Sequence, residues 1–338
     1  MDAKERKTMK AMYLCDIKEN INKIYNAKTQ QTLRTHYTFF DKIVSKSELQ
    51  GATDTECIFT TWGFPAFTSE EIKYYFPCLK AVFYAAGSVR YFAEPFLDEN
   101  IKVISAWLAN AVPVAEYTVS QIILANKGFY NAARMYKNTV GHKRAAAYCS
   151  AYPGNYNTNV GILGVGAIGS MVAEKLRHYH LNIYAYDPFL SDAQAQQLNV
   201  KKVGLKDVFE NCQTISNHIA NLPETEGLLN YALFSAMKKT GVLINTGRGA
   251  QVVEADLAKA LKEVPTRSAV LDVTIQEPCE KNSPLYTLPN VFLTPHIAGS
   301  MGNECQHMGE HVMTDALHFA DNEPLSYEVT KKMLKTMA

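Results

Sequence analysis

Two kinds of apolar pattern alternate along most of this chain of 338 residues. Short strand-like runs, most of them apolar, lie at 11–15, 57–61, 81–85, 101–105, 160–163, 183–186, 214–219, 241–246, 268–273 and 291–294. Helical patterns separate several of these runs, at 17–25, 205–211, 225–237 and 254–262. Alternation of this kind predicts an α/β protein built on parallel sheets with helices around them.

The alternation of strands and helices is interrupted in the middle of the chain. A single long helix is predicted from Pro113 to about Lys137, with the proline near its first turn. This helix is predicted to lead from a first domain to a second. Residues 141–156 are mostly small and polar and predict a surface loop, whereas residues 28–54 are polar and favour no particular element.

Two serines are predicted to begin helices. Ser69 precedes Glu70 and Glu71, which suit the first turn of a helix. Ser300 precedes the last long helix, in which an apolar stripe is formed by Met301, Cys305, Met308, Val312, Ala316 and Ala320.

A glycine motif lies between two predicted strands. Gly164, Gly166 and Gly169 follow the run at 160–163 in G-x-G-x-x-G spacing and open a helical pattern. The first glycine permits a tight turn, the second lets the backbone approach a pyrophosphate, and the third lets the helix pack close to the strand. Asp187 ends the next strand, where its carboxylate suits a ribose diol and repels a 2′-phosphate. The motif predicts NAD binding, and the alternative is a βαβ turn with incidental glycines.

Composition narrows the class of protein without identifying it. Hydrophobic residues make up 47% of the chain and charged residues 20%, which is typical of a globular protein. The net charge of +1 gives no basic excess for nucleic acid, and no apolar run is long enough to span a membrane. Seven scattered cysteines without a CxxC pair predict buried thiols in a reducing compartment, hence the cytoplasm.

Three ionisable residues follow predicted strands in the second half of the chain: Arg248, Glu277 and His296. Ligands of open α/β sheets bind at the carboxyl ends of strands, so these side chains are expected near a bound nicotinamide. A histidine paired with a carboxylate can exchange a proton with a forming alkoxide, and an arginine can hold a carboxylate and a carbonyl. Taken singly, the arginine also suits a surface ion pair, the glutamate a loop, and the histidine a helix cap.

The second half of the chain resembles the D-isomer-specific 2-hydroxyacid dehydrogenases. The similar segments are ILGVGAIG, HIANLPETEGLLN, LINTGRGAQVVEADLAKAL, VLDVTIQEP and FLTPHIAGS, which occur in the order typical of that family. The resemblance covers about residues 100–315. It implies two Rossmann-like domains, one flavodoxin-like and one NAD-binding, with an active-site cleft between them. The implied substrate-binding domain comprises residues 1–110 and 300–338, and the implied NAD-binding domain residues 111–299.

The resemblance also implies roles for particular residues. Arg248 is implied to bind substrate, Glu277 to partner the base, and His296 to act as acid and base. The cofactor is implied to lie along Gly164, Gly166, Ala167, Ile168, Gly169, Asp187, Ile219, Ala220, Thr225, Thr246, Gly247, Arg248, Asp272 and His296. A homodimer is implied as well.

Some positions depart from the family pattern. Ala220 and Trp107 stand where the family usually has proline, and the loop predicted to bind the substrate carboxylate reads AAGSVRYF. Backbone N–H groups of Ser88 and Val89 can still bind a carboxylate there. Arg90 can either bind a second anion or simply be exposed to solvent. Trp62 suits either the wall of a substrate pocket or packing between the domains.

One further motif does not lead to a site. His307 and His311 belong to an H-x-x-E-H pattern on a predicted helix, but a third zinc ligand is missing, so no metal is predicted. The sequence therefore predicts an NAD-dependent enzyme that interconverts a small 2-oxo acid and its D-2-hydroxy acid. The alternative is an NADH-sensing binding protein on the same fold.

Overall fold

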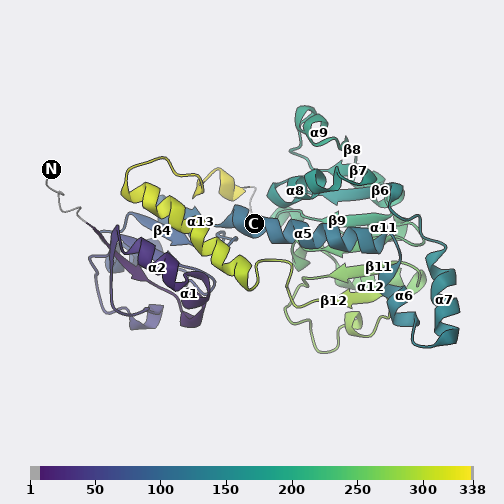
Figure 1. Cartoon of the computed structure of the whole chain (residues 1–338), viewed down its shortest axis with the longest axis horizontal. Helices are drawn as coiled ribbons and strands as arrows, with labels where there is room; N and C mark the ends of the chain where they lie inside the picture. Colours follow the sequence, from purple (N-terminus) through teal and green to yellow (C-terminus); the bar gives the residue numbers. More distant parts are fainter. Residues whose placement is uncertain (1–7, 336–338) are drawn as a thin grey trace. The chain divides into compact units, whose positions relative to one another are not determined.

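The computed structural model describes residues 8–335 of the chain, which divides into two units (Figure 1). One unit is formed by the residues up to Ala111 together with those from Ser300 on, and the other by Val112–Gly299. Each unit contains one sheet, in which all strand pairs but one are parallel. The predicted α/β class with two parallel sheets is confirmed.

The first unit is built on a six-stranded sheet in the order β13-β5-β4-β3-β1-β2. Its strands are β1 (Met9–Tyr13), β2 (Tyr37–Phe39), β3 (Cys57–Thr60), β4 (Ala81–Tyr84), β5 (Lys102–Ser105) and β13 (Glu328–Val329). Its helices are α1 (Lys18–Ile24), α2 (Ala27–Leu33), α3 (Ser69–Tyr75), α4 (Ala93–Asp98) and α13 (Asn303–Ala320), with 3-10 turns η1 (Lys46–Glu48) and η5 (Met333–Lys335). Only β13 pairs antiparallel, against β5.

Successive residues of the central strands point to opposite faces of the sheet, and each face has its own hydrophobic core. Phe59 and Phe83 point to one face of the sheet, where α1, α2 and α13 add Ile21, Leu33 and Val312. Their neighbours in the strands pack on the opposite face with α3 and α4. Strands buried on both faces read as continuous apolar runs, which is the pattern seen in the sequence. Figure 1 shows α13 lying alongside α1 and α2, with which it is in contact.

The second unit is built on a seven-stranded sheet in the order β12-β11-β10-β9-β6-β7-β8. Its strands are β6 (Tyr156–Leu163), β7 (His180–Tyr186), β8 (Lys201–Lys202), β9 (Thr214–Asn217), β10 (Val242–Asn245), β11 (Ser268–Leu271) and β12 (Val291–Leu293). Its helices are α6 (Phe129–Met135), α7 (Thr139–Cys149), α8 (Ala167–Leu176), α9 (Asp192–Leu198), α10 (Leu205–Asn211), α11 (Tyr231–Ala236) and α12 (Glu254–Glu263), with turns η2 (Pro223–Thr225), η3 (Gly249–Gln251) and η4 (Pro284–Tyr286). The order reverses between β6 and β9, which places a topological switch point there.

Helices cover both faces of this sheet. On one face, α10, α11 and α12 pack Phe209, Phe234 and Leu257 against the strands. On the other face, α8 and the second half of α5 (Trp107–Ala125) pack Val172 and Ile122. This three-layer arrangement leaves the carboxyl ends of the strands for loops, and these loops carry the predicted site.

Several boundaries differ from the sequence-based predictions. The long helix predicted at 113–137 is two helices, because α5 starts at Trp107 and stops at Ala125 and Gly128 adopts a left-handed conformation before α6. Pro113 therefore lies inside α5 rather than in its first turn. The loop predicted at 141–156 is largely helix α7, whose first turn is capped by the Asn138 side chain and whose Lys, Arg and Ala residues favour helix.

The residues that cap or begin two helices also differ from the predicted ones. Thr68, not Ser69, caps α3, because its hydroxyl accepts a hydrogen bond from Glu71 N at 3.2 Å and the Glu71 carboxylate accepts one from Thr68 N at 2.9 Å. The last helix begins at Asn303, three residues after Ser300. The polar segment at 28–54 contains most of α2 and the short strand β2. The expectation that all cysteines are buried is wrong, since Cys78 is exposed, although all seven thiols are free.

Candidate active site

The glycine loop follows β6 and is shaped by close backbone contacts. Gly164 has φ of +81°, and a Cβ there would lie 2.6 Å from the carbonyl oxygen of His218. A Cβ on Gly169 would lie 2.0 Å from the carbonyl oxygen of Gly164. Contacts within the protein therefore exclude any side chain at these two positions, whether or not a ligand is bound. Gly166 is different, because it is exposed and a Cβ there would meet nothing within 4 Å. Its missing side chain leaves open space over the start of α8, which fits a cofactor phosphate.

Helix α8 begins directly after this open position. Ala167 and Ile168 occupy its first turn, and Gly166 caps it without a side chain. The first N–H groups of a helix have no partner within the helix and carry a partial positive charge. The residues predicted to hold the pyrophosphate thus lie together at one helix N-terminus.

Asp187 lies just after β7 and is oriented by two backbone groups. Its Oδ2 accepts a hydrogen bond from Val165 N at 2.7 Å, and its Oδ1 accepts one from Phe189 N at 2.7 Å. The first of these bonds ties the carboxylate to the glycine loop. Each oxygen keeps a further lone pair, so the carboxylate can also accept hydrogen bonds from a ribose diol.

The loop after β9 carries Ile219, Ala220 and Thr225. The Thr225 hydroxyl donates to Ala220 O at 2.7 Å and accepts from Leu222 N at 3.0 Å. Because these bonds use the hydroxyl within its own loop, Thr225 shapes that loop. The bond to Ala220 O also fixes the backbone at the position where the family usually has proline.

Three amide side chains link the loop after β9 to the loop that contains Thr246, Gly247 and Arg248. Asn217 Nδ2 donates to Gln251 Oε1 at 2.8 Å and to Asn245 Oδ1 at 3.0 Å. Gln251 Nε2 donates to Ile219 O at 3.1 Å, and Gln251 Oε1 accepts from Arg248 N at 3.2 Å. Asn245 Nδ2 donates to Arg248 O at 3.0 Å. We call Asn217, Asn245 and Gln251 the amide network; all three are buried.

Sequence reasoning did not assign this network a role. Its signal was present, because an asparagine ends each of the buried strands β9 and β10, and a buried amide needs a polar partner. Reading each strand separately gave no indication that the two asparagines meet each other and Gln251.

His218 was also left unassigned. Its Nε2 lies 2.9 Å from Ser216 Oγ, and its Nδ1 lies 3.5 Å from Thr246 Oγ1. Burial lowers the pKa of the His218 imidazole to about 3. His218 is therefore a neutral side chain between the hydroxyls of Ser216 and Thr246, at the start of the loop that contains Ile219.

The three predicted catalytic residues converge. His296 Nδ1 lies 2.7 Å from Glu277 Oε2, and both side chains are well exposed. Burial lowers the pKa of the Arg248 guanidinium, and the negative charge of Glu277 opposes that effect. Arg248 Nη1 donates to Gly247 O at 2.8 Å, which leaves other guanidinium N–H groups for a ligand. A histidine hydrogen-bonded to a glutamate, together with a guanidinium, thus lies past the ends of β10, β11 and β12.

Asp272 holds the loop that presents His296. Its Oδ1 accepts from the Thr294 hydroxyl at 2.6 Å and from Ile297 N at 2.8 Å, and its Oδ2 accepts from Ala298 N at 2.8 Å. The side chain is buried. The geometry gives Asp272 a place beneath the histidine loop, and its predicted contact with the cofactor stays a prediction.

The residues predicted to bind the substrate carboxylate lie in the first unit, after β4. Ser105 Oγ donates to Ala86 O at 2.8 Å and to Gly87 O at 2.9 Å, which fixes the start of their loop. Within the loop, Ser88 is half-buried, Val89 is buried and Arg90 is exposed. Trp62 follows the neighbouring strand β3 and is partly exposed.

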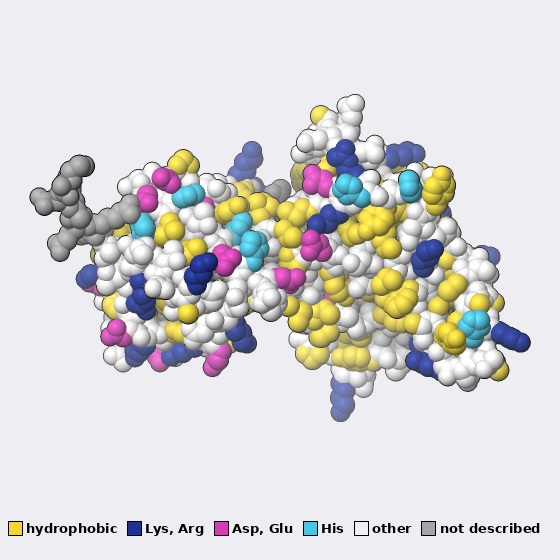
Figure 2. All heavy atoms as spheres, viewed as in Figure 1, with side chains coloured by type: hydrophobic (Ala, Val, Ile, Leu, Met, Phe, Trp, Pro, Cys, Tyr) yellow, Lys and Arg dark blue, Asp and Glu magenta, His cyan; other side chains and the backbone are white. Residues whose placement is uncertain are grey.

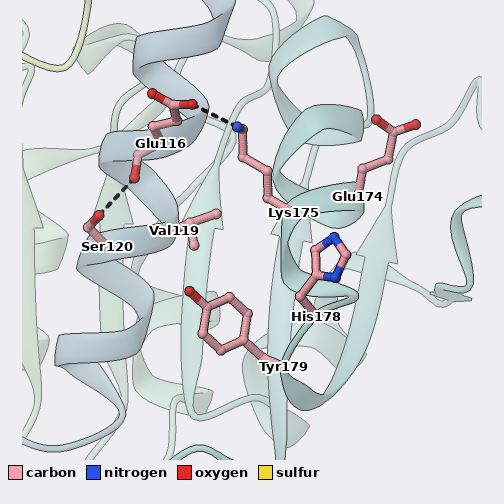
Figure 3. Close-up of a pocket in the computed structure, with 7 residues that line it drawn as sticks. All are labelled: Glu116, Val119, Ser120, Glu174, Lys175, His178 and Tyr179. Carbon is pink, nitrogen blue, oxygen red and sulfur yellow. Dashed lines mark hydrogen bonds and ion pairs between the residues drawn. The ribbon is translucent and has the colours of Figure 1, made fainter.

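One surface pocket lies elsewhere, in the second unit. It has a volume of about 530 Å³ and lies between α5 and α8, lined by Glu116, Val119, Ser120, Glu174, Lys175, His178 and Tyr179 (Figure 3). Lys175 Nζ and Glu116 Oε1 form an ion pair across it at 2.8 Å. No residue of the predicted site lines this pocket.

Residues 8–335 contain no group of three or more His, Cys, Asp or Glu side chains placed to hold a metal ion. His311 of the H-x-x-E-H motif packs against Tyr327, with ring centroids 3.6 Å apart and ring planes tilted by 35°. None of the helices in the same range is long and apolar enough to cross a membrane.

Comparison with known proteins places the chain in a family. Residues 119–298 match the family model described as D-isomer specific 2-hydroxyacid dehydrogenase, NAD binding domain. The D-3-phosphoglycerate dehydrogenase of Archaeoglobus fulgidus is 30% identical over 228 residues, which are 68% of this chain and 42% of that protein. The Mycobacterium tuberculosis enzyme of the same name is 32% identical over 63% of this chain and 39% of that protein. The chain thus spans about two fifths of the length of these curated relatives.

Solved structures share the fold. D-mandelate dehydrogenase from Rhodotorula graminis superposes with a TM-score of 0.78 at 20% identity, covering 96% of this chain and 98% of that one. D-lactate dehydrogenase with NAD+ from Lactobacillus jensenii superposes with a TM-score of 0.73 at 20% identity, covering 96% and 100%. At such identities the likeness concerns the fold alone.

Proposed function

Because the chain belongs to the family of D-isomer specific 2-hydroxyacid dehydrogenases, we propose that it is an NAD(H)-dependent oxidoreductase. It interconverts a small 2-oxo acid and its D-2-hydroxy acid. The observation that carries this proposal is the hydrogen bond between His296 Nδ1 and Glu277 Oε2, 2.7 Å apart, with the charge of Glu277 also acting on Arg248.

His296 acts as the acid and base of the reaction. Glu277 engages Nδ1, so Nε2 is the nitrogen that exchanges a proton with the substrate oxygen. The carboxylate also orients the ring and stabilises the imidazolium. When bound, NADH supplies the hydride that C2 of the oxo acid accepts. In the reverse direction, neutral His296 takes the hydroxyl proton.

Arg248 binds the substrate carboxylate and polarises its carbonyl. A guanidinium stays charged even where burial lowers its pKa, and its forked donors match a carboxylate. The amide network holds the backbone of Arg248 at both its N–H and its carbonyl oxygen. The arginine therefore needs little reorganisation when the substrate arrives.

NAD is the cofactor that suits this site. The open space at Gly166 and the N-terminus of α8 fit the pyrophosphate, and Asp187 fits a ribose diol but repels a 2′-phosphate. Backbone N–H groups of Ser88 and Val89, in the first unit, suit a carboxylate. The free thiols suit a reducing compartment, and we place the protein in the cytoplasm.

The chain forms a homodimer through its second unit. Several large apolar side chains are exposed on that unit, among them Leu124, Phe129, Tyr136, Val140 and Tyr179. Figure 2 shows hydrophobic side chains gathered over the face on which α5 and α6 lie. Light scattering of the protein checks this, and Phe129→Asp is expected to shift the mass toward that of a monomer. A monomeric wild type at micromolar concentration would contradict it.

The catalytic assignment is tested by His296→Asn. We expect kcat for NADH oxidation with a 2-oxo acid to fall at least about 100-fold, the usual size of an acid–base contribution. The dissociation constant for NADH, measured by fluorescence titration, should stay within about twofold. His142→Asn, at an exposed position on α7, is the matched control and should retain turnover. Undiminished turnover in His296→Asn would refute the assignment. NADH binding without turnover of any oxo acid by the wild type would favour a sensor of NADH instead.

A further inference from the structure

The carboxyl edge of the six-stranded sheet places three loops in a row. The strand order puts β4, β3 and β1 side by side, and all three are parallel. Ser88 and Val89 follow β4, Trp62 follows β3, and Ile17 follows β1. If the substrate carboxylate is bound after β4, the rest of the acid can extend toward the ends of β3 and β1.

The loops after β1 and β3 form one surface. Asp16 N donates to Gly63 O at 2.9 Å, and Asn20 Nδ2 donates to Trp62 O at 2.9 Å. The Cys15 thiol donates to Trp62 O at 3.4 Å. A Cβ on Gly63 would lie 3.0 Å from Ile17 Cβ, so the Ile17 side chain packs on Gly63 beside Trp62.

This surface is apolar and open to solvent. Ile17 is 51% exposed, Trp62 is 36% exposed, and Tyr91 from the loop after β4 is 52% exposed. The Tyr91 hydroxyl donates to Phe64 O at 3.1 Å, which connects the loop after β4 to the same surface. Large apolar side chains exposed together at the ligand-binding edge of a parallel sheet indicate a surface that an apolar group covers.

The charges around this surface do not suit a phosphate. Lys18 is paired with Glu48 at 2.6 Å, and Lys46 is paired with Glu71 at 2.8 Å. Asp16, between Cys15 and Ile17, is an acid whose Oδ1 accepts a hydrogen bond from Lys46 N at 2.9 Å. A phosphorylated side chain would approach the Asp16 carboxylate and two lysines already paired with carboxylates, which leaves Arg90 of the loop after β4 as the cation to be tested.

Resting on the proposed function, we propose that the substrate is a 2-oxo acid with an uncharged apolar side chain, aromatic or branched aliphatic. That side chain packs on Ile17 and Trp62. This substrate class differs from the phosphorylated substrate that the names of the curated relatives imply for those proteins. Arg90, the exposed cation of the loop after β4, then remains solvated.

The test compares kcat/KM of the full chain with NADH and five acids: phenylpyruvate, 4-methyl-2-oxopentanoate, glyoxylate, hydroxypyruvate and 3-phosphohydroxypyruvate. One of the first two is expected to exceed each of the other three at least about tenfold, since even one methylene in an apolar pocket changes selectivity by that factor. A preference for glyoxylate, hydroxypyruvate or the phosphorylated acid would overturn the inference and leave the proposed function standing. No turnover of any acid, with NADH bound, would overturn both.

Two variants test whether Trp62 and Ile17 determine the preference for acids with apolar side chains. Trp62→Ala should lower the ratio of kcat/KM for phenylpyruvate to that for glyoxylate at least about tenfold. Ile17→Arg should lower the use of phenylpyruvate and raise the relative use of 3-phosphohydroxypyruvate. Tyr74→Ala removes an aromatic side chain that is 61% exposed on α3 and should leave all ratios unchanged. An unchanged ratio in Trp62→Ala, or phosphorylated-acid turnover that Arg90→Gln abolishes, would contradict the inference.

Discussion

His296 adopts φ of +54°, in a region of backbone conformation that side chains other than glycine seldom occupy. Its N–H donates to Asp272 O and Thr294 O, both at 3.0 Å, and the Asp272 carboxylate holds the residues on either side. Strained residues of this kind persist where their surroundings enforce them, and they concentrate at functional sites. The strain at His296 thus supports the role proposed for its imidazole.

His218 gives a prediction about stability at low pH. Burial lowers the pKa of its imidazole to about 3, whereas an unfolded histidine titrates near 6.5. Below about pH 6.5 the unfolded chain therefore binds a proton that the folded chain excludes, and stability is lost as the pH falls. The free energy of unfolding should fall by up to about 1.4 kcal/mol per pH unit from this group between pH 6 and pH 4.

Urea titrations at several pH values check this prediction. His218→Gln should flatten the pH dependence in that window, because no proton is then taken up at this position on unfolding. His142→Gln, at an exposed histidine, should leave the slope as it is in the wild type. Equal slopes for His218→Gln and the wild type would show that His218 is protonated in the folded chain.

The loops after β9 and β10 are held together by side chains rather than by sheet hydrogen bonds. Through the amide network, Gln251 contacts the backbone of both Ile219 and Arg248. Gln251→Met keeps the approximate volume and leaves buried donors and acceptors unpaired, each at a cost of about 1–3 kcal/mol. We expect kcat/KM for the oxo acid to fall at least about tenfold, because Arg248 is no longer fixed.

Steady-state kinetics and urea unfolding separate this positioning role from a purely structural one. Adding Asn217→Leu to Gln251→Met removes both partners of one hydrogen bond, so the double variant should lose less stability than the sum of the two single variants, without recovering kcat/KM. Gln197→Met, at an exposed position on α9, serves as the control and should change neither quantity. A wild-type kcat/KM in Gln251→Met, in spite of its lower stability, would assign the network to folding alone.

Sequence reasoning succeeded for elements whose signal is local. The buried strands and the glycine loop of the second unit were predicted because apolar runs and fixed spacing are written into consecutive residues. Helix α7 and the break at Gly128 were missed, since tertiary packing decides whether a polar, alanine-rich stretch such as that after Asn138 stays helical. The meeting of Asn217 with Gln251 was missed because 34 residues separate them in the chain.

Each unit has its own sheet and its own cores, so the molecule is expected to unfold in two steps. NADH should stabilise only the step that belongs to Val112–Gly299, by about 2.7 kcal/mol at 100 times the dissociation constant. For a unit of this size that corresponds to a rise in Tm of roughly 5–10 °C. Differential scanning calorimetry with and without NADH measures both steps.

The same calorimetry measures the preference for NADH over NADPH. NADPH should shift the transition much less than NADH, because Asp187 repels the 2′-phosphate, and Asp187→Ser should narrow the difference. Lys206→Ser, at an exposed position on α10, is the control and should preserve it. Equal shifts by the two cofactors in the wild type would contradict the role of Asp187.

The first unit is discontinuous in the chain, and this has a consequence for synthesis on the ribosome. Ile21 and Ile24 of α1 share their core with Met308, Val312 and Ala316 of α13, and β5 pairs with β13. These partners emerge almost 300 residues after α1, when the whole of Val112–Gly299 has already been made. The second unit can therefore fold while the first is incomplete, with the apolar face of α1 still exposed. Nascent chains stalled before α13 would be the form of this protein that most needs a chaperone.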